Sequence, residues 1–181
     1  MTFDGVLFDC DGVLVDSETH TGQPLSEEWP VSFRERRNQA LMRDVQPIRG
    51  AAAAVAKIHE LYQGRIAFAL GADRFKVELQ LEKCGLMPYF KGRIFSRHEL
   101  PRSKPAPDVY LAAAAALGGD PRRCAVVEDT VTGATAGMAA SATVFGYSPP
   151  EAGHDAPVAL RGVGAGAIFG DMAGLPDLMT G

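Results

Sequence analysis

Acidic residues gather near the start of the chain, in the stretch FDCDGVLVDSE. Four carboxylates follow the short apolar run Gly5–Phe8 within ten residues: Asp9, Asp11, Asp16 and Glu18. Carboxylates this close repel one another unless a cation or solvent compensates. Asp9 and Asp11 suit a hard cation such as Mg²⁺, which prefers oxygen ligands. An EF-hand is excluded, because its loop needs a third oxygen-bearing residue before its glycine and a helix in front. An acidic turn that ends a strand is the alternative.

A second acidic pair, Glu128 and Asp129, follows the apolar run Cys124–Val127. A buried strand that ends in adjacent carboxylates carries an electrostatic penalty unless these groups are solvated or bound to metal. Asp129 also stands where it could cap a helix that begins at Val131. The pair is therefore interpreted as a metal ligand, a helix N-cap, or both.

Lys104 lies in the proline-rich stretch RSKPAPD. Pro105 favours extended geometry for the residue before it, and Pro107 suits the first turn of a helix. A lysine held at the entrance of a helix can neutralise a phosphate group as a point charge. A surface lysine in a turn is the alternative.

The elements that must position these residues alternate between strand and helix. Strands are expected at Gly5–Phe8, Arg65–Leu70, Arg93–Phe95, Cys124–Val127, Ala142–Phe145 and Ala167–Phe169. Helices are expected at Ala51–Tyr62, Arg74–Lys83, Pro107–Leu117, Val131–Ala140 and Asp171–Met179. This pattern predicts an α/β fold with a mostly parallel sheet, whose ligand crevice lies beyond the carboxyl ends of the strands.

Composition bounds the class of protein. The chain has 181 residues, 46% hydrophobic and 22% charged, which suits one globular domain. A net charge of −4 gives no reason to expect a nucleic acid or an anionic membrane as partner. No signal peptide or membrane span is recognisable, and the three cysteines lack metal or disulfide spacing, so we expect a cytoplasmic protein. The four histidines show no ligand spacing, and each is expected to be a surface histidine or one with its hydrogen bonds satisfied.

Three stretches, DCDGVLVDSE, SKPAPDVY and VVEDTVTGATAG, resemble motifs one, three and four of the haloacid dehalogenase superfamily. More narrowly, they are similar to its phosphatase branch with a helical cap inserted after motif one, the branch of phosphoglycolate phosphatase and β-phosphoglucomutase. The resemblance implies a Rossmann-like three-layer α/β/α core, formed by residues 1–16 and 46–181. Residues 17–45 would be the remnant of a truncated helical cap, since this segment is about half the usual length.

The resemblance also implies roles for individual residues. Asp9 would be the nucleophile that forms an aspartyl-phosphate, and Asp11 the general acid and base. Lys104 would bind Asp9 and the phosphoryl group, as the third catalytic residue. The implied Mg²⁺ site consists of Asp9, the main-chain carbonyl of Asp11, Asp129 and the nearby Glu128. The implied phosphate site adds the main-chain amides of Cys10, Asp11 and Gly71 to Lys104.

Two features depart from the family pattern. Motif two places a hydroxyl at the end of the second strand, and this position is Leu70 here. The second departure is the short cap. We expect the protein to be a monomer. The resemblance implies a Mg²⁺-dependent phosphatase-type hydrolase for a small phosphorylated metabolite, and the two departures predict weak activity. The alternatives are a sugar-phosphate mutase of the β-phosphoglucomutase type and a catalytically impaired member that binds metal or phosphate.

Overall fold

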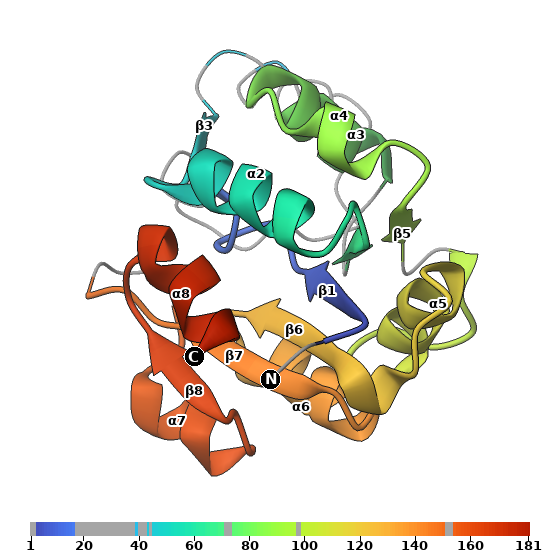
Figure 1. Ribbon diagram of the computed structural model, residues 1–181, viewed down its shortest axis with the longest axis vertical. Coiled ribbons are helices and arrows are strands. Elements are labelled where there is room, and N and C mark those ends of the chain that lie inside the picture. Colours follow the sequence, from blue (N-terminus) through green and yellow to red (C-terminus); the bar gives the residue numbers. More distant parts are fainter. Residues whose placement is uncertain are drawn as a thin grey trace.

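The computed structural model of the chain describes residues 3–16, 39, 43, 45–70, 74–96, 99–150 and 154–181. Six strands form the main sheet (Figure 1): β1 (Gly5–Phe8), β4 (Ile66–Leu70), β5 (Ile94–Ser96), β6 (Cys124–Glu128), β7 (Thr143–Tyr147) and β8 (Ala167–Phe169). Their order is β5-β4-β1-β6-β7-β8, and neighbouring strands pair in parallel throughout. The predicted α/β class and all six predicted strands are confirmed, with ends that shift by one or two residues.

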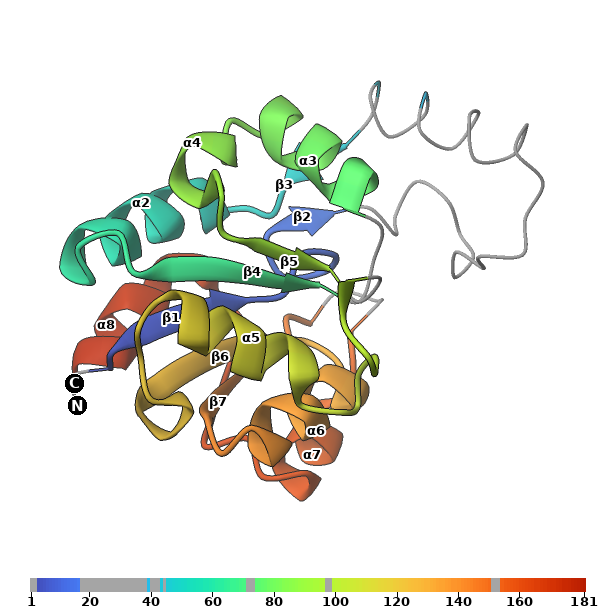
Figure 2. The same cartoon turned by 90° about the vertical axis from the view of Figure 1, so that its right-hand side faces the viewer.

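Helices cover both faces of the sheet, which gives three layers (Figure 2). One face carries α2 (Ala51–Leu61), α3 (Arg74–Lys83), α4 (Met87–Phe90), the 3₁₀ turn η3 (Met172–Gly174) and α8 (Leu175–Thr180). The other face carries α5 (Asp108–Ala116), α6 (Val131–Ala139) and α7 (Pro157–Gly162). Strands covered on both faces have few positions for polar side chains, and β4 and β6 are buried along their whole length.

Several short elements were not expected, because each contains too few residues to show a periodic pattern of apolar side chains. They are the helices α4 and α7, the 3₁₀ turn η2 (Pro121–Arg123), and a two-stranded antiparallel ladder of β2 (Val15–Asp16) and β3 (Gln46–Pro47). The ladder pairs Asp16 with Gln46, so the chain returns beside the point where it leaves the core. Residues 17–38, 40–42 and 44, which make up most of the predicted cap remnant, lie outside the described residues. The cap therefore remains a prediction.

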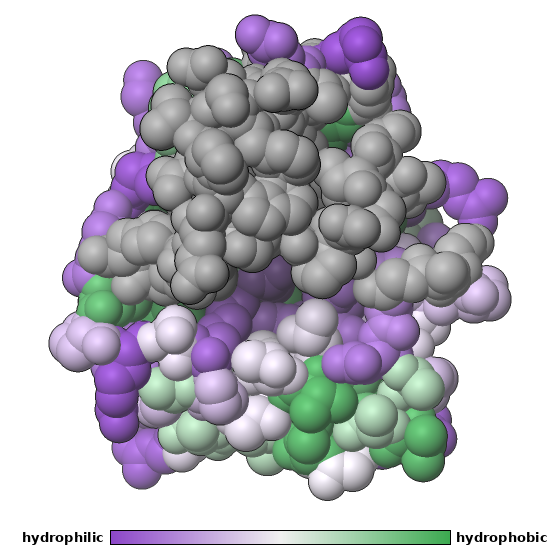
Figure 3. Space-filling view, turned by 180° about the vertical axis from the view of Figure 1, so that it is seen from behind, coloured by the Kyte–Doolittle hydropathy of each residue, from purple (hydrophilic) through white to green (hydrophobic). Residues whose placement is uncertain are grey.

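Strand order reverses direction around β1, which pairs with β4 on one side and with β6 on the other. From β1 the chain builds β4 and β5 on one side and then crosses to β6 on the other, which creates a topological switch point. In Figure 2 the arrowheads of β4 and β5 point to the side that Figure 3 shows face-on. The described surface in the middle of that face is hydrophilic and hollowed (Figure 3), as a polar site at the strand ends requires. No described helix has the length and apolar character needed to cross a membrane.

Helix α6 lies close to the sheet because Gly137 faces it. A Cβ at this position would approach Val144 Cγ2 to 2.8 Å and Val126 Cγ1 to 3.1 Å. Both valines are buried and β-branched, so neither can rotate away cheaply.

We predict that Gly137→Ala destabilises the protein. Overpacking costs about 1–3 kcal/mol, which outweighs the gain of about 1 kcal/mol in helix propensity. Urea unfolding measures the difference. Gly162→Ala is the matched control, since this glycine also lies in a helix and a Cβ there meets nothing within 4 Å. Equal free energies of unfolding for the two variants would contradict the prediction.

Candidate active site

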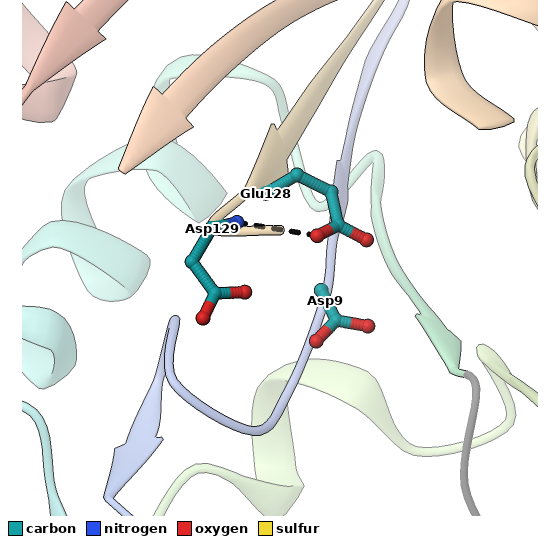
Figure 4. A group of neighbouring side chains, drawn as sticks. All are labelled: Asp9, Glu128 and Asp129. Atoms are coloured by element: carbon teal, nitrogen blue, oxygen red, sulfur yellow. Dashed lines mark hydrogen bonds between the residues drawn. The ribbon is translucent and has the colours of Figure 1, made fainter. Parts of the chain in front are cut away.

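Three carboxylates converge at the carboxyl ends of β1 and β6 (Figure 4). Oxygen atoms of Asp9, Glu128 and Asp129 all lie within 4.8 Å of one another. The two strands are parallel neighbours in register, with Phe8 opposite Val127, so the residues that follow them emerge side by side. Fold topology thus brings together acidic residues that are more than a hundred positions apart in the sequence.

Lys104 reaches this cluster from the loop before α5. Its Nζ lies 2.6 Å from Asp9 Oδ1 and 2.6 Å from Glu128 Oε1, and 4.9 Å from the centre of the Tyr110 ring. Burial disfavours the charged amine, but Asp9 and Glu128 outweigh this effect and raise the pKa of Lys104 well above its usual range. Burial also raises the pKa of Asp9, an effect that Lys104 opposes and the neighbouring carboxylates reinforce. Lys104 is therefore a buried cation whose partners are the cluster's own carboxylates.

Glu128 anchors the cluster through both of its oxygens. Oε1 accepts from Lys104 Nζ and from the Tyr110 hydroxyl, at 2.6 Å and 2.7 Å. Oε2 accepts from the amides of Asp129 and Thr130 and from the Thr130 hydroxyl, at 3.1 to 3.3 Å. The carboxylate lies against Gly133 in the first turn of α6, where a Cβ would overlap it. The absence of a side chain at Gly133 makes room for a buried, hydrogen-bonded Glu128.

Only one carboxylate oxygen of Asp129 has a hydrogen-bond partner among the described residues, unlike Glu128. Its Oδ2 contacts His154 Nδ1 at 3.1 Å, whereas its buried Oδ1 has no hydrogen-bond partner among the described residues. The N-cap of α6 is Thr130, whose hydroxyl accepts from the Gly133 amide. The N-cap interpretation of Asp129 is therefore wrong. Burial raises the pKa of Asp129 to about 6. An unpartnered carboxylate oxygen inside an acidic cluster fits a divalent cation, which would supply the missing partner.

The Asp11 carboxylate is held by two residues of α3. Lys76 Nζ donates to Asp11 Oδ2 at 2.7 Å, and Gln80 Nε2 donates to Asp11 Oδ1 at 3.0 Å. Gln80 Oε1 lies 3.9 Å from Cys10 Sγ, a weak thiol contact. Lys76 and Gln80 were not predicted as site residues. Their signal was available, since two polar residues four positions apart share the buried face of a helix with Val77.

The main-chain amides of Cys10 and Gly71 were predicted to donate to phosphate, and that of Cys10 remains a prediction. Leu70 was predicted to stand in place of the hydroxyl of motif two. Leu70 ends β4 and is buried in the apolar cluster that also contains Cys10, Val77 and Leu81. Gly71 lies outside the described residues, so its main-chain amide remains a predicted phosphate donor. The structure thus places Asp9, Glu128, Asp129 and Lys104 together. Asp11, two positions after Asp9, is held by Lys76 of α3.

Comparison with known proteins defines the class to which this fold and site belong. The sequence model of the haloacid dehalogenase-like hydrolases matches residues 18–141, more than half of the chain. The chain belongs to this family of hydrolases. The matched region includes Lys104, Glu128 and Asp129 and begins after Asp9 and Asp11.

Similar proteins include phosphatases. The 6-phosphogluconate phosphatase of Escherichia coli (strain K12) is 23% identical over 212 aligned positions, which cover 97% of this chain and 94% of the relative. Hexitol phosphatase B of the same organism is 47% identical over 60 residues, 33% of this chain and 27% of that protein. The chain spans only 7% of the length of another relative, Protein SUPPRESSOR OF QUENCHING 1, chloroplastic, of Arabidopsis thaliana, with 40% identity over 77 residues.

Among solved structures, a HAD family hydrolase from Deinococcus radiodurans R1, with bound phosphate and sodium, superimposes with a TM-score of 0.78. It is 29% identical, and the alignment covers 96% of this chain and 93% of that one. The Rossmann-like core expected from the sequence is thereby confirmed.

The raised pKa of Asp129 predicts how stability depends on pH without metal. Between the carboxyl's ordinary value of 3.8 and about 6, the folded state retains a proton that the unfolded state has released. This group's contribution to stability is therefore present below pH 4 and is lost as the pH rises towards 6, by up to about 3 kcal/mol. Asp129→Asn removes the titration, so its stability relative to wild type should increase over this interval. Urea unfolding with a chelator at pH 4, 5, 6 and 7 tests this, and a constant difference would contradict it.

Proposed function

We propose that this chain is a Mg²⁺-dependent phosphatase-type hydrolase, which transfers a phosphoryl group from a small phosphorylated metabolite to Asp9 and then to water. The observation that carries the proposal is the convergence of Asp9, Lys104 and Asp129 at the switch point of the sheet. Membership of a hydrolase family and similarity to phosphatases support it.

In the first half-reaction, a carboxylate oxygen of Asp9 attacks phosphorus and the bond to the ester oxygen breaks. Asp11 gives its proton to the departing alcohol. In the second, Asp11 takes a proton from water, the resulting hydroxide attacks the aspartyl-phosphate, and inorganic phosphate and the Asp9 carboxylate are released. Asp11 thus serves as acid and then as base.

Charge in the transferring phosphoryl group has to be balanced. Lys104 supplies one positive charge from its position against Asp9. Asp9, the main-chain carbonyl of Asp11 and Asp129 would hold Mg²⁺, with Glu128 close by. When bound, Mg²⁺ would neutralise negative charge on the phosphoryl oxygens. Lys76 and Gln80 fix the direction of the Asp11 side chain from α3, which sets where its proton can be delivered.

Substrate class is suggested by the relatives. The names 6-phosphogluconate phosphatase and hexitol phosphatase B both describe enzymes for phosphorylated sugar derivatives. We propose a compound of this kind as substrate. The phosphate bound by the Deinococcus radiodurans R1 hydrolase supports a phosphate subsite here.

A catalytically impaired protein that binds metal and phosphate is the second candidate function. It is favoured by Leu70, an apolar side chain in the position where the family pattern places a hydroxyl. A sugar-phosphate mutase is less well supported, because it must exclude water with a closed cap. The alignment with 6-phosphogluconate phosphatase is longer than this chain, so that relative contains residues with no counterpart here.

We predict phosphate release from aryl and sugar phosphates in the presence of Mg²⁺, and its loss with a chelator. Asp9→Asn should abolish turnover, because the amide is a poor nucleophile and cannot form the aspartyl-phosphate. Phosphate release and thermal stability are measured on wild type and variant. Turnover that survives in the Asp9→Asn protein would contradict the mechanism. Absent turnover, with Mg²⁺ and a phosphate mimic still raising the Tm of wild type, would favour the second candidate.

We also predict that Leu70→Ser increases kcat/KM on an aryl phosphate. One preorganised donor to a developing oxyanion contributes roughly 10²–10³ in rate in acyl-transfer enzymes, and we expect the gain not to exceed this range. Leu81→Ser is the control, because Leu81 is a buried leucine of the same apolar cluster on α3. Both variants should lose stability, and only Leu70→Ser should gain activity. An unchanged kcat/KM in Leu70→Ser would rule out the missing hydroxyl as a limitation.

A further inference from the structure

We infer that His154 is a positioning residue for the metal site, which orients the Asp129 carboxylate so that one oxygen is reserved for the cation. This inference rests on the Mg²⁺ site of the proposed function. It assigns a role to a histidine that sequence spacing does not connect with any ligand set, since 25 positions separate His154 from Asp129.

The two oxygens of Asp129 are used differently. Oδ2 lies 3.1 Å from His154 Nδ1, while Oδ1 is buried and has no partner among the residues that the structure describes. An ionised carboxylate only accepts hydrogen bonds, so the contact requires the proton on Nδ1 of the imidazole. Figure 4 shows the Asp129 side chain emerging at the strand ends near Asp9, with which it shares the acidic cluster. One oxygen is held by the protein, and the other is left for a cation.

His154 is itself fixed in place. Its ring packs edge-on against Tyr147, with centroids 5.4 Å apart and an interplanar angle of 77°. The pair is also enclosed from the other side by Gly12, where a Cβ would overlap Asp129 Oδ2 and lie 3.5 Å from His154 Cε1. The histidine side chain is 10% exposed and that of Asp129 is 4% exposed, so water competes little for their contact.

Asp155, the residue after His154, forms hydrogen bonds with the backbone around Asp129. The amide of Asp155 donates to the main-chain carbonyl of Asp129 at 3.1 Å, and Asp155 Oδ2 accepts from the Val131 amide at 2.6 Å. Ser148 Oγ donates to the main-chain carbonyl of Asp155 at 2.9 Å. These bonds fix the backbone of the histidine relative to the carboxylate that it contacts. A rigid backbone and a packed ring are what a positioning residue needs.

Outer partners of metal ligands act by limiting the orientations that the ligand can adopt. Their removal typically lowers metal affinity by about 10- to 100-fold. His154→Leu removes the donor and keeps an apolar side chain against Tyr147. His154→Asn keeps an N–H donor near the position of Nδ1. His59→Leu is the matched control, because His59 also packs edge-on against a tyrosine, Tyr89, at 5.3 Å and 68°.

The experiment measures Mg²⁺ affinity directly, by calorimetric titration of the full chain without substrate. We expect the Kd of His154→Leu to rise about 10- to 100-fold, and those of His154→Asn and His59→Leu to stay within about threefold of wild type. Equal affinity in His154→Leu and wild type would overturn the inference, as would equal losses in His154→Leu and His154→Asn. If wild type binds no Mg²⁺ at millimolar concentration, the proposed metal dependence fails and this inference fails with it.

A second measurement does not depend on whether the His154→Leu variant folds. Nitrogen NMR of the histidine rings in wild type distinguishes the tautomers, and His154→Asn identifies the signal that belongs to His154. We expect a protonated Nδ1 in His154, with and without Mg²⁺. A His154 ring that carries its proton on Nε2 alone would overturn the inference even if Mg²⁺ binds.

Discussion

The ion pair that Lys104 forms with Asp9 and Glu128 is the interaction on which the site depends. Three carboxylates meet at the ends of β1 and β6, and the lysine supplies one positive charge against them. Burial raises the pKa values of Asp9 and Asp129, whereas the pKa of Lys104 is raised by Asp9 and Glu128 against the effect of its own burial. A site with excess negative charge of this kind favours the binding of a further cation.

The fold around this ion pair gives each carboxylate a separate task. Glu128 is saturated by protein donors and holds Lys104 and the start of α6 together. Asp129, its neighbour in sequence, keeps an oxygen without a partner among the described residues. This difference depends on Gly133, which admits the Glu128 carboxylate, and on His154, which takes the second oxygen of Asp129. Two adjacent acids thereby become chemically unlike.

Asp9 and Asp11 are separated in a similar way. Asp9 faces the loop before α5 and contacts Lys104, whereas Asp11 faces α3 and contacts Lys76 and Gln80. Because each carboxylate has its own cation, the repulsion that their spacing in the sequence implies is largely offset. The two acids that the proposed reaction requires for nucleophilic attack and for proton transfer are thus held by opposite layers of the structure. Leu70 ends β4 and lies in the apolar cluster that also contains Cys10, the residue between the two acids.

Much of this arrangement was determined by the sequence alone. Two apolar runs of four residues, Gly5–Phe8 and Cys124–Val127, lead directly into Asp9 and Glu128. Within the alternation of strands and helices they predicted both the parallel sheet and the edge at which acids collect. Lys104 was identified through a motif, since a lysine in a proline-rich loop has no distinctive spacing of its own. Short elements such as α4 and the β2–β3 ladder were missed, because they contain too few residues for a period.

Only the tertiary structure decided how the acids differ. Thr130 takes the N-cap of α6 and His154 contacts one oxygen of Asp129, which leaves the other oxygen without a partner among the described residues. Two residues of α3 hold Asp11. The contacts of His154, Lys76 and Gln80 with these acids join positions that are 25 to 69 residues apart, and no local pattern states which acid each of them meets. The sequence determines which residue types reach the strand ends, because burial and periodicity are local properties. Their partners are decided by the packing of helices and loops from elsewhere in the chain, because hydrogen bonds and ion pairs depend on distances that only the folded chain sets.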